Sequence, residues 1–184
     1  ADGRVRRFVE KPTPGTTDSS LINAGTYVLE PDVVDLVEPH RRVSIEREVF
    51  PALVADHQLA GVATGDYWLD TGRPEFYLRA NLDMLDGLRG PLDGSPVEPG
   101  AVVAPSATLD RAVVSSGATV CDQAHVTRSV LLPGALVGDG ATVIDSIVAG
   151  RVGPGAVVRD CVIGRTGAVA AAAAMSSSRV PQPE

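Results

Sequence analysis

Residues 97–108 read VEPGAV and VAPSAT, two six-residue units that each begin with valine and carry alanine at the fifth position. Four further valine-led units follow at residues 137–142 (VGDGAT), 143–148 (VIDSIV), 152–157 (VGPGAV) and 158–163 (VRDCVI). Short repeats of this kind build solenoids, because one unit cannot bury its apolar face without stacked neighbours. The pattern therefore predicts a triangular coil with three units per turn. The aliphatic side chain points into the prism and the small residue fits near its corner.

A longer period supports the same fold. DRAVV at 110–114, RSVLL at 128–132, DSIV at 145–148 and DCVI at 160–163 recur at intervals close to the length of one turn of the coil. We expect a left-handed parallel β-helix over residues 91–167, with bulges or a loop where the register slips, near Val113 and at 132–136. The scarcity of aromatic residues fits a narrow interior. Residues 168–184 are predicted to be a frayed helix or a disordered tail.

The first 90 residues differ in character, and a linker rich in glycine and proline separates them from the repeats. Apolar runs predict strands at residues 5–9, 21–29 and 61–64. Helices are expected at 31–36 and over 74–85. A further helix should begin at Ser44 and kink or restart at Pro51. This part is therefore predicted to be α/β.

Two charged residues stand at the end of the first predicted strand, in FVEKP at residues 8–12. Pro12 cannot donate a ladder hydrogen bond, so it ends the strand. Glu10 and Lys11 are then left at its C-terminal edge, where open α/β sheets bind ligands. Lysine is a compact cation suited to a phosphate, and glutamate accepts hydrogen bonds from sugar hydroxyls. A solvated ion pair before a turn is the alternative interpretation.

Small residues interrupt the second predicted strand, in LINAGTY at 21–27. Asn23 to Gly25 would let a ligand or another backbone come close, and the asparagine amide offers a donor and an acceptor. A β-bulge would explain the same residues. In the helix that follows, Ser44 is a suitable N-cap, and Glu46 and Glu48 lie in the first turn, where the helix dipole favours carboxylates.

The segment YWLDTG at 67–72 contains the only tryptophan of the chain. Asp70 or Thr71 could cap the helix that follows. Alternatively, Asp70 is an oxygen ligand for Mg²⁺, which binds one or two carboxylates together with substrate phosphates.

The overall composition excludes several classes of protein. A formal net charge of -7 and a pI near 4.9 argue against nucleic-acid binding, since no basic stripe exists to neutralise phosphates. Cys121 and Cys161 lack the spacing of a metal site, and buried free thiols in a reducing cytoplasm are favoured over a disulfide. No apolar run approaches about 18 residues, so a soluble, cytoplasmic protein without a membrane partner is expected.

Together these motifs resemble the sugar-1-phosphate nucleotidyltransferases, most closely the mannose-1-phosphate guanylyltransferases of the GDP-mannose pyrophosphorylase type. The matching segments are FVEKP at 8–12, INAGTY at 22–27, SIEREVFP at 44–51 and WLDTG at 68–72. The helix at 74–85 and the repeats follow in the order that the family shows, so the resemblance extends to about Gly164. It implies that residues 1–90 are the C-terminal half of a Rossmann-like nucleotidyltransferase domain, on the sugar-phosphate side.

The resemblance also implies a reaction in nucleotide-sugar biosynthesis. A sugar 1-phosphate attacks the α-phosphorus of a nucleoside triphosphate in line and releases pyrophosphate, with Mg²⁺ and lysine neutralising charge. Lys11 and Asp70 would be the catalytic residues. Lys11 would hold the sugar phosphate, and Asp70 would be one of two Mg²⁺ carboxylates. Glu10 and Asn23 would bind sugar hydroxyls with the Gly25 backbone nearby, and Glu46 is a further candidate for substrate binding.

The chain departs from the family in its nucleotide-binding half. A Gly-rich loop followed by arginine and lysine, and the other metal-binding aspartate, should precede FVEKP, and nothing here matches either. We therefore expect this chain to be inactive or very weak alone, as a fragment, a split-gene subunit or a decayed copy. GTP and GDP-mannose follow by likeness only, because neither the base nor the sugar epimer is readable from these residues.

Two other classes of protein stay open. One is a non-catalytic regulatory or assembly subunit, and measurable pyrophosphorolysis would eliminate it. The other is a β-helix acyltransferase with His125 as general base, which leaves the first 90 residues unexplained. The exposed end of the coil also predicts a homo-oligomer formed through the β-helix.

Overall fold

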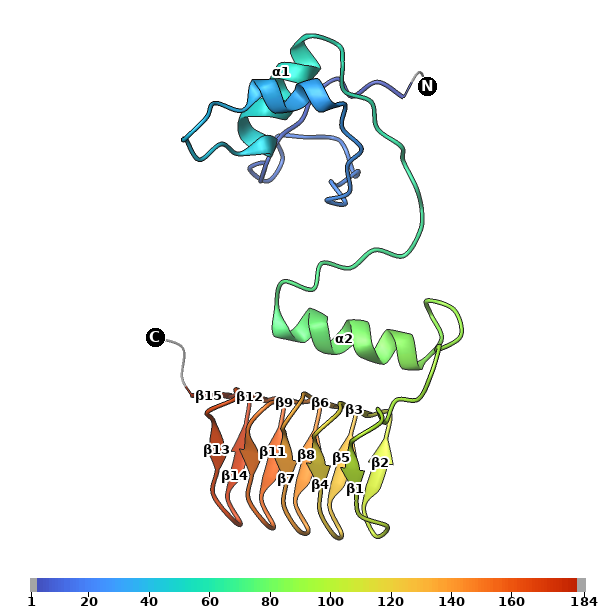
Figure 1. Cartoon of the computed structure of the whole chain (residues 1–184), viewed down its shortest axis with the longest axis vertical. Helices are drawn as coiled ribbons and strands as arrows, with labels where there is room; N and C mark the ends of the chain where they lie inside the picture. Colours follow the sequence, from blue (N-terminus) through green and yellow to red (C-terminus); the bar gives the residue numbers. More distant parts are fainter. Residues whose placement is uncertain (1–2, 182–184) are drawn as a thin grey trace. The chain divides into compact units, whose positions relative to one another are not determined.

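The structure is a computed structural model that describes residues 3–181, and the chain divides into two compact units, Ala1–Trp68 and Leu69–Glu184 (Figure 1). The division falls after Trp68, so the helix at 74–85 lies in the same compact unit as the repeats. The helices are η1 (Pro31–Leu36, 3₁₀), η2 (Ile45–Val49, π), α1 (Phe50–Ala55) and α2 (Pro74–Leu85).

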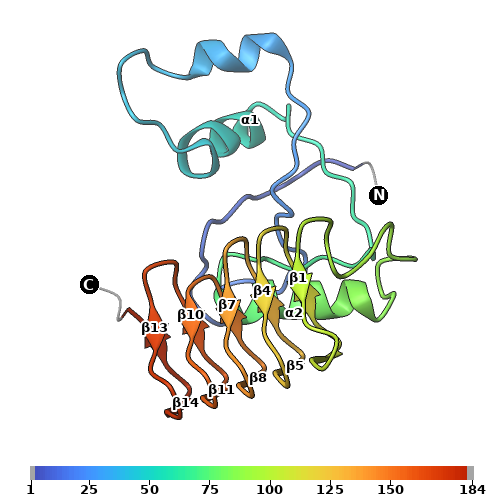
Figure 2. The ribbon, with the colours of Figure 1, turned by 60° about the horizontal axis from the view of Figure 1, so that its bottom comes forward.

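The repeats of unit 2 form a parallel β-helix with three sheets of five short strands, which confirms the predicted coil (Figure 2). The first sheet contains β1 (Val102–Val103), β4 (Thr119–Val120), β7 (Leu136–Val137), β10 (Arg151–Val152) and β13 (Ala168–Val169). The second contains β2 (Thr108–Asp110), β5 (His125–Thr127), β8 (Thr142–Ile144), β11 (Val157–Arg159) and β14 (Ala174–Ser176). The third contains β3 (Val113–Val114), β6 (Val130–Leu131), β9 (Ile147–Val148), β12 (Val162–Ile163) and β15 (Arg179–Val180).

The interior of the prism is filled by one aliphatic side chain from each strand. Val120, Val126 and Leu131 represent the three sheets in one coil, and all three are fully buried. Alanines such as Ala118 and Ala124 occupy the corners and are buried as well. The six-residue units therefore pack as predicted, because valine fits the narrow interior and alanine fits where the backbone turns.

The slips of register near Val113 and at 132–136 are not bulges. Strands of successive coils pair in register, as Val102 does with Thr119, and every coil turns between its second and third sheets through a corner such as Arg111–Ala112. That corner is one residue too short for a full hexad, which shifts the repeats near Val113. Residues 132–135 are an ordinary corner between β6 and β7.

One corner of the prism is exceptional. The coil that separates Leu136 from its partner Arg151 is shorter than its neighbours, because just Ala149 and Gly150 connect β9 to β10. The short corner lies against the next coil, and a Cβ atom built on Gly150 would meet the carbonyl oxygens of Gly167 at 2.1 Å and Gly164 at 2.4 Å. No other residue type fits at position 150 without a shift of the backbone.

The corners between the second and third sheets place a left-handed residue at the same position in each coil. Arg128, Asp145 and Asp160 have φ values of 45°, 49° and 50° there. Each such residue costs about 1 kcal/mol or more. Side chains pair from coil to coil along this edge: Arg128 Nε donates to Asp145 Oδ1 at 2.7 Å, and Ser177 Oγ donates to Asp160 Oδ2 at 2.8 Å. These contacts are at least partly exposed. They offset some of the conformational cost of the left-handed residues.

The prediction of a frayed helix or disordered tail over 168–184 is wrong for the residues described. Strands β13, β14 and β15 complete a fifth coil that pairs in register with β10, β11 and β12. Alanine favours helix in isolation, but the preceding coil offers a ready ladder, and alanine is small enough for every corner. Residues 182–184 lie outside the described part of the chain.

Helix α2 lies along the third sheet (Figure 1). It matches the predicted helix at 74–85, with Pro74 in its first turn. Its N-cap is Arg73, and no side chain caps it, so the interpretation of Asp70 or Thr71 as a cap is wrong. In residues 3–181 no helix is long and apolar enough to cross a membrane.

Unit 1 has a small core. Val49, Phe50 and Leu53 are buried, and Phe8 and Ile45 pack against them. The strands predicted at 5–9, 21–29 and 61–64 do not form, and a single antiparallel bridge joins Arg4 to Ala60. A strand needs a neighbour to pair its backbone groups, and the described residues of unit 1 supply none.

Candidate functional site

The start of η2 positions one carboxylate of the site. Ser44 Oγ accepts from Arg47 N at 3.3 Å, which confirms Ser44 as the cap, and Ser44 N donates to Glu48 Oε1 at 3.0 Å. This reciprocal arrangement fixes the first turn, in which Glu46 lies half-buried. Pro51 follows in the first turn of α1, so the helix restarts there as expected.

Asn23, Tyr27 and Glu46 form one hydrogen-bonded cluster. Asn23 Nδ2 lies 2.9 Å from Glu46 Oε1 and 2.6 Å from Tyr27 Oη. The Tyr27 hydroxyl lies 3.3 Å from the same Glu46 oxygen. The fold therefore brings together side chains from two motifs that are well separated in the sequence, at an exposed surface of unit 1.

The backbone between Asn23 and Tyr27 is shaped by two further contacts. Gly25 N donates to Asn23 Oδ1 at 3.0 Å, and Gly25 takes a φ of 73°. Trp68 Nε1 donates to the carbonyl oxygen of Ala24 at 3.2 Å. A Cβ atom on Gly25 would meet nothing within 4 Å, so this loop leaves open space beside the cluster. Its interruption is a turn and not a β-bulge, since no strand flanks it.

Glu10 and Lys11 lie side by side. Lys11 Nζ is 3.8 Å from Glu10 Oε1, with the lysine side chain 81% exposed and the glutamate side chain 23% exposed. Lys11 has a φ of 49°, a left-handed conformation that is strained for a residue directly before proline. The backbone thus presents the ammonium group to solvent, where it can meet a phosphate.

Asp70 belongs to unit 2. Its Oδ1 accepts from Gly72 N at 2.8 Å, so the aspartate closes a local turn. No group of three or more histidine, cysteine or acidic residues that could hold a metal ion occurs among residues 3–181. Asp70 offers a single carboxylate, and Mg²⁺ sites commonly use one or two carboxylates together with substrate phosphates.

A pH-sensitive contact supports the start of η2. The Ser44 backbone N–H, and then the Arg41 guanidinium at 2.8 Å, hold the pKa of Glu48 below its ordinary value of 4.5. A lowered pKa in the folded state means that the stabilisation is complete above the unfolded pKa and is lost as the pH falls through the folded pKa.

We therefore expect unit 1 to lose stability as the pH falls below the ordinary glutamate pKa of 4.5. Glu48→Gln should reduce the pH dependence, because the amide keeps an acceptor for Ser44 N but does not titrate. The measurement is urea unfolding followed by Trp68 fluorescence between about pH 6 and pH 3. An unchanged slope in Glu48→Gln would contradict the assignment.

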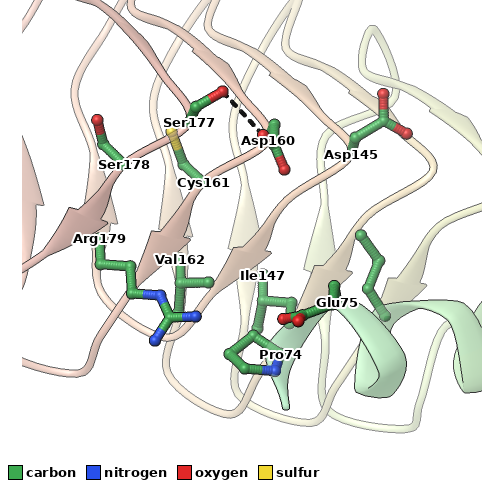
Figure 3. A pocket seen from close by; sticks show the side chains of 11 residues that line it. Pro74, Glu75, Asp145, Ile147, Asp160, Cys161, Val162, Ser177, Ser178 and Arg179 are labelled. Carbon is green, nitrogen blue, oxygen red and sulfur yellow. Dashed lines mark hydrogen bonds between the residues drawn. The ribbon is translucent and has the colours of Figure 1, made fainter. Parts of the chain in front are cut away.

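Unit 2 has a groove of about 290 Å³ between α2 and the last coils (Figure 3). Its carboxylates are engaged within the fold, Asp145 by Arg128 and Asp160 by Ser177. The groove is lined by Pro74, Glu75, Leu78, Asp145, Ile147, Asp160, Cys161, Val162, Ser177, Ser178 and Arg179. It includes none of the residues that the sequence predicted for a site.

His125 and the two cysteines, which the alternative interpretations concern, show no special environment. His125 is exposed on β5, and its neighbours in register are Thr108 and Thr142. Both cysteines are free as predicted, with Cys161 buried and Cys121 half-buried. Burial, followed by the carboxylates of Asp139 and Asp122, raises the pKa of the Cys121 thiol and keeps it in the unreactive form.

Unit 1 thus holds Glu10, Lys11, Asn23, Gly25 and Glu46, and it brings Asn23, Gly25 and Glu46 into one set of hydrogen bonds. Sequence reasoning gave Tyr27 no role, although Tyr27 lies inside the INAGTY motif. In the sequence, the short spacing between Asn23 and Tyr27 was the only sign that Tyr27 belongs to the site. That spacing does not reveal that the Tyr27 hydroxyl reaches Glu46.

Two family models match successive parts of the chain. Residues 1–87 match the nucleotidyl transferase family, and residues 83–153 and 106–179 match the GlmU-like C-terminal hexapeptide family. These matches define a class of protein in which a nucleotidyl transferase domain is followed by hexapeptide repeats. The chain carries the GlmU-like hexapeptide repeats, and its residues 1–87 are similar to the nucleotidyl transferases.

Individual relatives carry a more specific name. A mannose-1-phosphate guanylyltransferase of Mycobacterium tuberculosis is 42% identical over 116 residues, which are 59% of this chain and 32% of the relative. A mannose-1-phosphate guanyltransferase of Schizosaccharomyces pombe is 45% identical over 89 residues, 48% of this chain and 24% of the relative. The chain thus spans about a quarter to a third of the length of these relatives.

A solved structure also matches the chain. It is a perosamine N-acetyltransferase of Caulobacter crescentus, crystallised with CoA and GDP-perosamine, with 22% identity and a TM-score of 0.28 over 47% of this chain and 54% of the other. A TM-score this low carries no argument about function.

Proposed function

We propose that unit 1 is the sugar-phosphate half of a site that forms a nucleotide sugar, GDP-mannose, from GTP and mannose 1-phosphate. The observation that carries the proposal is the cluster of Asn23, Tyr27 and Glu46, with Glu10 and Lys11 in the same unit. Hydroxyl-binding acceptors and one exposed ammonium group are what a sugar phosphate requires. The names of the relatives support the choice of mannose and guanine.

In this reaction an oxygen of the sugar phosphate forms a bond to the α-phosphorus, the bond to the β-phosphate breaks, and pyrophosphate leaves. Lys11 would hold the sugar phosphate and offset its charge, while Glu10 and the cluster would accept hydrogen bonds from sugar hydroxyls. The chain's residues thus bind and orient the nucleophile, which lowers the barrier by fixing its geometry.

Asp70 is a suitable ligand for Mg²⁺, although it cannot bind the ion alone. Mg²⁺ retains water and takes one or two carboxylates together with substrate phosphates. Oδ1 of Asp70 accepts from Gly72 N, and Oδ2 has no hydrogen bond within the described chain. When bound, the ion would neutralise phosphate charge during transfer.

Calorimetric titration of the chain with GDP-mannose and Mg²⁺ tests the proposal. Lys11→Ala should weaken binding about 10- to 100-fold, the worth of a hydrogen bond to a charged group. Asp70→Ala should weaken binding only when Mg²⁺ is present. Arg6→Ala removes a nearby exposed cation and is the control. Undetectable binding at millimolar ligand, or equal losses in Arg6→Ala and Lys11→Ala, would refute the half-site.

Lys11 is the only lysine in the sequence, which allows an independent test. An amine-specific acylating reagent can modify only Lys11 and the chain's α-amino group. Mannose 1-phosphate should slow modification of Lys11 and leave the α-amino group unaffected.

A second function is a non-catalytic regulatory or assembly subunit. Both functions use the same sugar-phosphate half-site. Pyrophosphorolysis of GDP-mannose by the purified chain would eliminate the second.

We further propose a cytoplasmic homo-oligomer that forms through the β-helix. Strands β13, β14 and β15 pair on one side only within the described residues, and unpaired strand edges are sites of association. Light scattering at micromolar concentration should give more than the mass of one chain, 19.0 kDa.

A further inference from the structure

The Asn23 side chain has no donor left for a ligand. Its amide nitrogen carries two hydrogens, and the two acceptors within reach are Glu46 Oε1 at 2.9 Å and Tyr27 Oη at 2.6 Å. Its oxygen accepts from Gly25 N at 3.0 Å. The orientation of the amide follows from this chemistry, since a carboxylate must face the NH₂ group and an N–H must face the oxygen.

The Tyr27 ring contacts the core of unit 1. Its ring packs edge-on against Phe50, with the centroids 4.8 Å apart, and Phe50 is 1% exposed. The hydroxyl accepts from Asn23 Nδ2, so its own hydrogen is free to point at Glu46 Oε1, 3.3 Å away. Tyr27 therefore joins the loop of residues 23–25 to η2.

The cluster leaves only acceptors for a ligand. Glu46 uses Oε1 for both internal contacts, and no hydrogen bond to its Oε2 occurs in residues 3–181. Asn23 Oδ1 keeps one lone pair beside the open space at Gly25. A sugar hydroxyl that meets these atoms must donate its hydrogen to them.

We propose that Tyr27 is a positioning residue that clamps the Asn23 amide and the Glu46 carboxylate, so that sugar hydroxyls are recognised as donors by Asn23 Oδ1 and Glu46 Oε2. This rests on the proposed function of unit 1 as a sugar-phosphate half-site. Asn23 is then an acceptor only, and Glu46 is a principal contact to the sugar.

Tyr27→Phe tests the clamp, because it keeps the ring on Phe50 and removes only the hydroxyl. Tyr77→Phe is a matched control: Tyr77 is 37% exposed against 38% for Tyr27, and it lies on α2 of unit 2. Binding of mannose 1-phosphate should weaken about tenfold in Tyr27→Phe and stay unchanged in the control, as expected for loss of a hydrogen bond that orders a charged acceptor.

Inorganic phosphate separates positioning from general damage. It can use Lys11 but has no sugar hydroxyl to donate to the cluster, so its binding should be equal in wild type and Tyr27→Phe. A parallel loss for both ligands would overturn the proposal, since it would mean that Tyr27 only supports the fold.

The side-chain amide signals of the ligand-free chain provide a readout that needs no sugar. The sequence has two asparagines, and the other, Asn81, donates one hydrogen bond to the Tyr77 carbonyl at 2.9 Å. Both Asn23 amide hydrogens should exchange slowly in wild type and one should become fast in Tyr27→Phe. Fast exchange in wild type would overturn the clamp. No binding of mannose 1-phosphate by wild type would instead overturn the proposed function and, with it, the recognition step.

Discussion

Gly150→Ala should destabilise the β-helix by about 3–5 kcal/mol, in the range of severe single substitutions. The added methyl group would lie 2.1 Å from the Gly167 carbonyl oxygen and 2.4 Å from that of Gly164. Both obstacles are backbone atoms of the next coil, which cannot rotate away as a flexible side chain can. Relief requires that β10 and β13 separate. Urea unfolding of unit 2, followed by circular dichroism, measures the loss.

Gly134→Ala is the matched control. Gly134 lies at the corresponding corner of the preceding coil, where a Cβ atom meets nothing within 4 Å and the φ of 83° is the only source of strain. That strain costs about 1–2 kcal/mol. A loss in Gly150→Ala no larger than in Gly134→Ala would show that the short corner adjusts easily.

Phe50→Ala should unfold unit 1 and abolish ligand binding. Truncating a buried phenylalanine costs about 3–5 kcal/mol, and a core with three buried side chains has little stability to lose. Phe8 and Tyr27 both pack their rings on Phe50, at centroid distances of 5.0 Å and 4.8 Å. The substitution therefore removes the support of the cluster as well as the core.

The measurement is Trp68 fluorescence for unit 1 and circular dichroism for the strands of unit 2. Unit 1 should lose its transition while the β-helix keeps its own, because the two compact units have separate cores. Phe50→Leu nearly preserves volume and should cost under about 1.5 kcal/mol. Retention of mannose 1-phosphate binding by Phe50→Ala would contradict the dependence of the cluster on this core.

The β-helix was readable from sequence because its physics is local and repeated. Each inward position demands an aliphatic side chain and each corner a small one, so valine and alanine report the fold directly. The same rule should have included residues 168–181, where Val169, Met175 and Val180 continue the inward series. The run of alanines hid it, since alanine alone favours a helix and only stacking on the preceding coil selects the strand.

The N-terminal strands could not be predicted correctly because strands depend on partners. Val28 is 101% exposed, so nothing among the described residues covers it. The site residues were more predictable than the strands, since short motifs fix local turns such as Asn23 to Gly25. Contacts across the fold, above all Tyr27 with Glu46, depend on how the loop meets η2, and no spacing in the sequence encodes them.

Each coil of the prism pairs with the coils before and after it, and the cross-section of the prism hardly changes along its length. The number of coils, and with it the length of the prism, can therefore vary. Five coils set neighbouring strands about 4.8 Å apart and span about 19 Å between the first and last. Duplicating or deleting one coil would lengthen or shorten the rod by one such step. The number of coils thus sets the length of the β-helix in steps of one strand spacing.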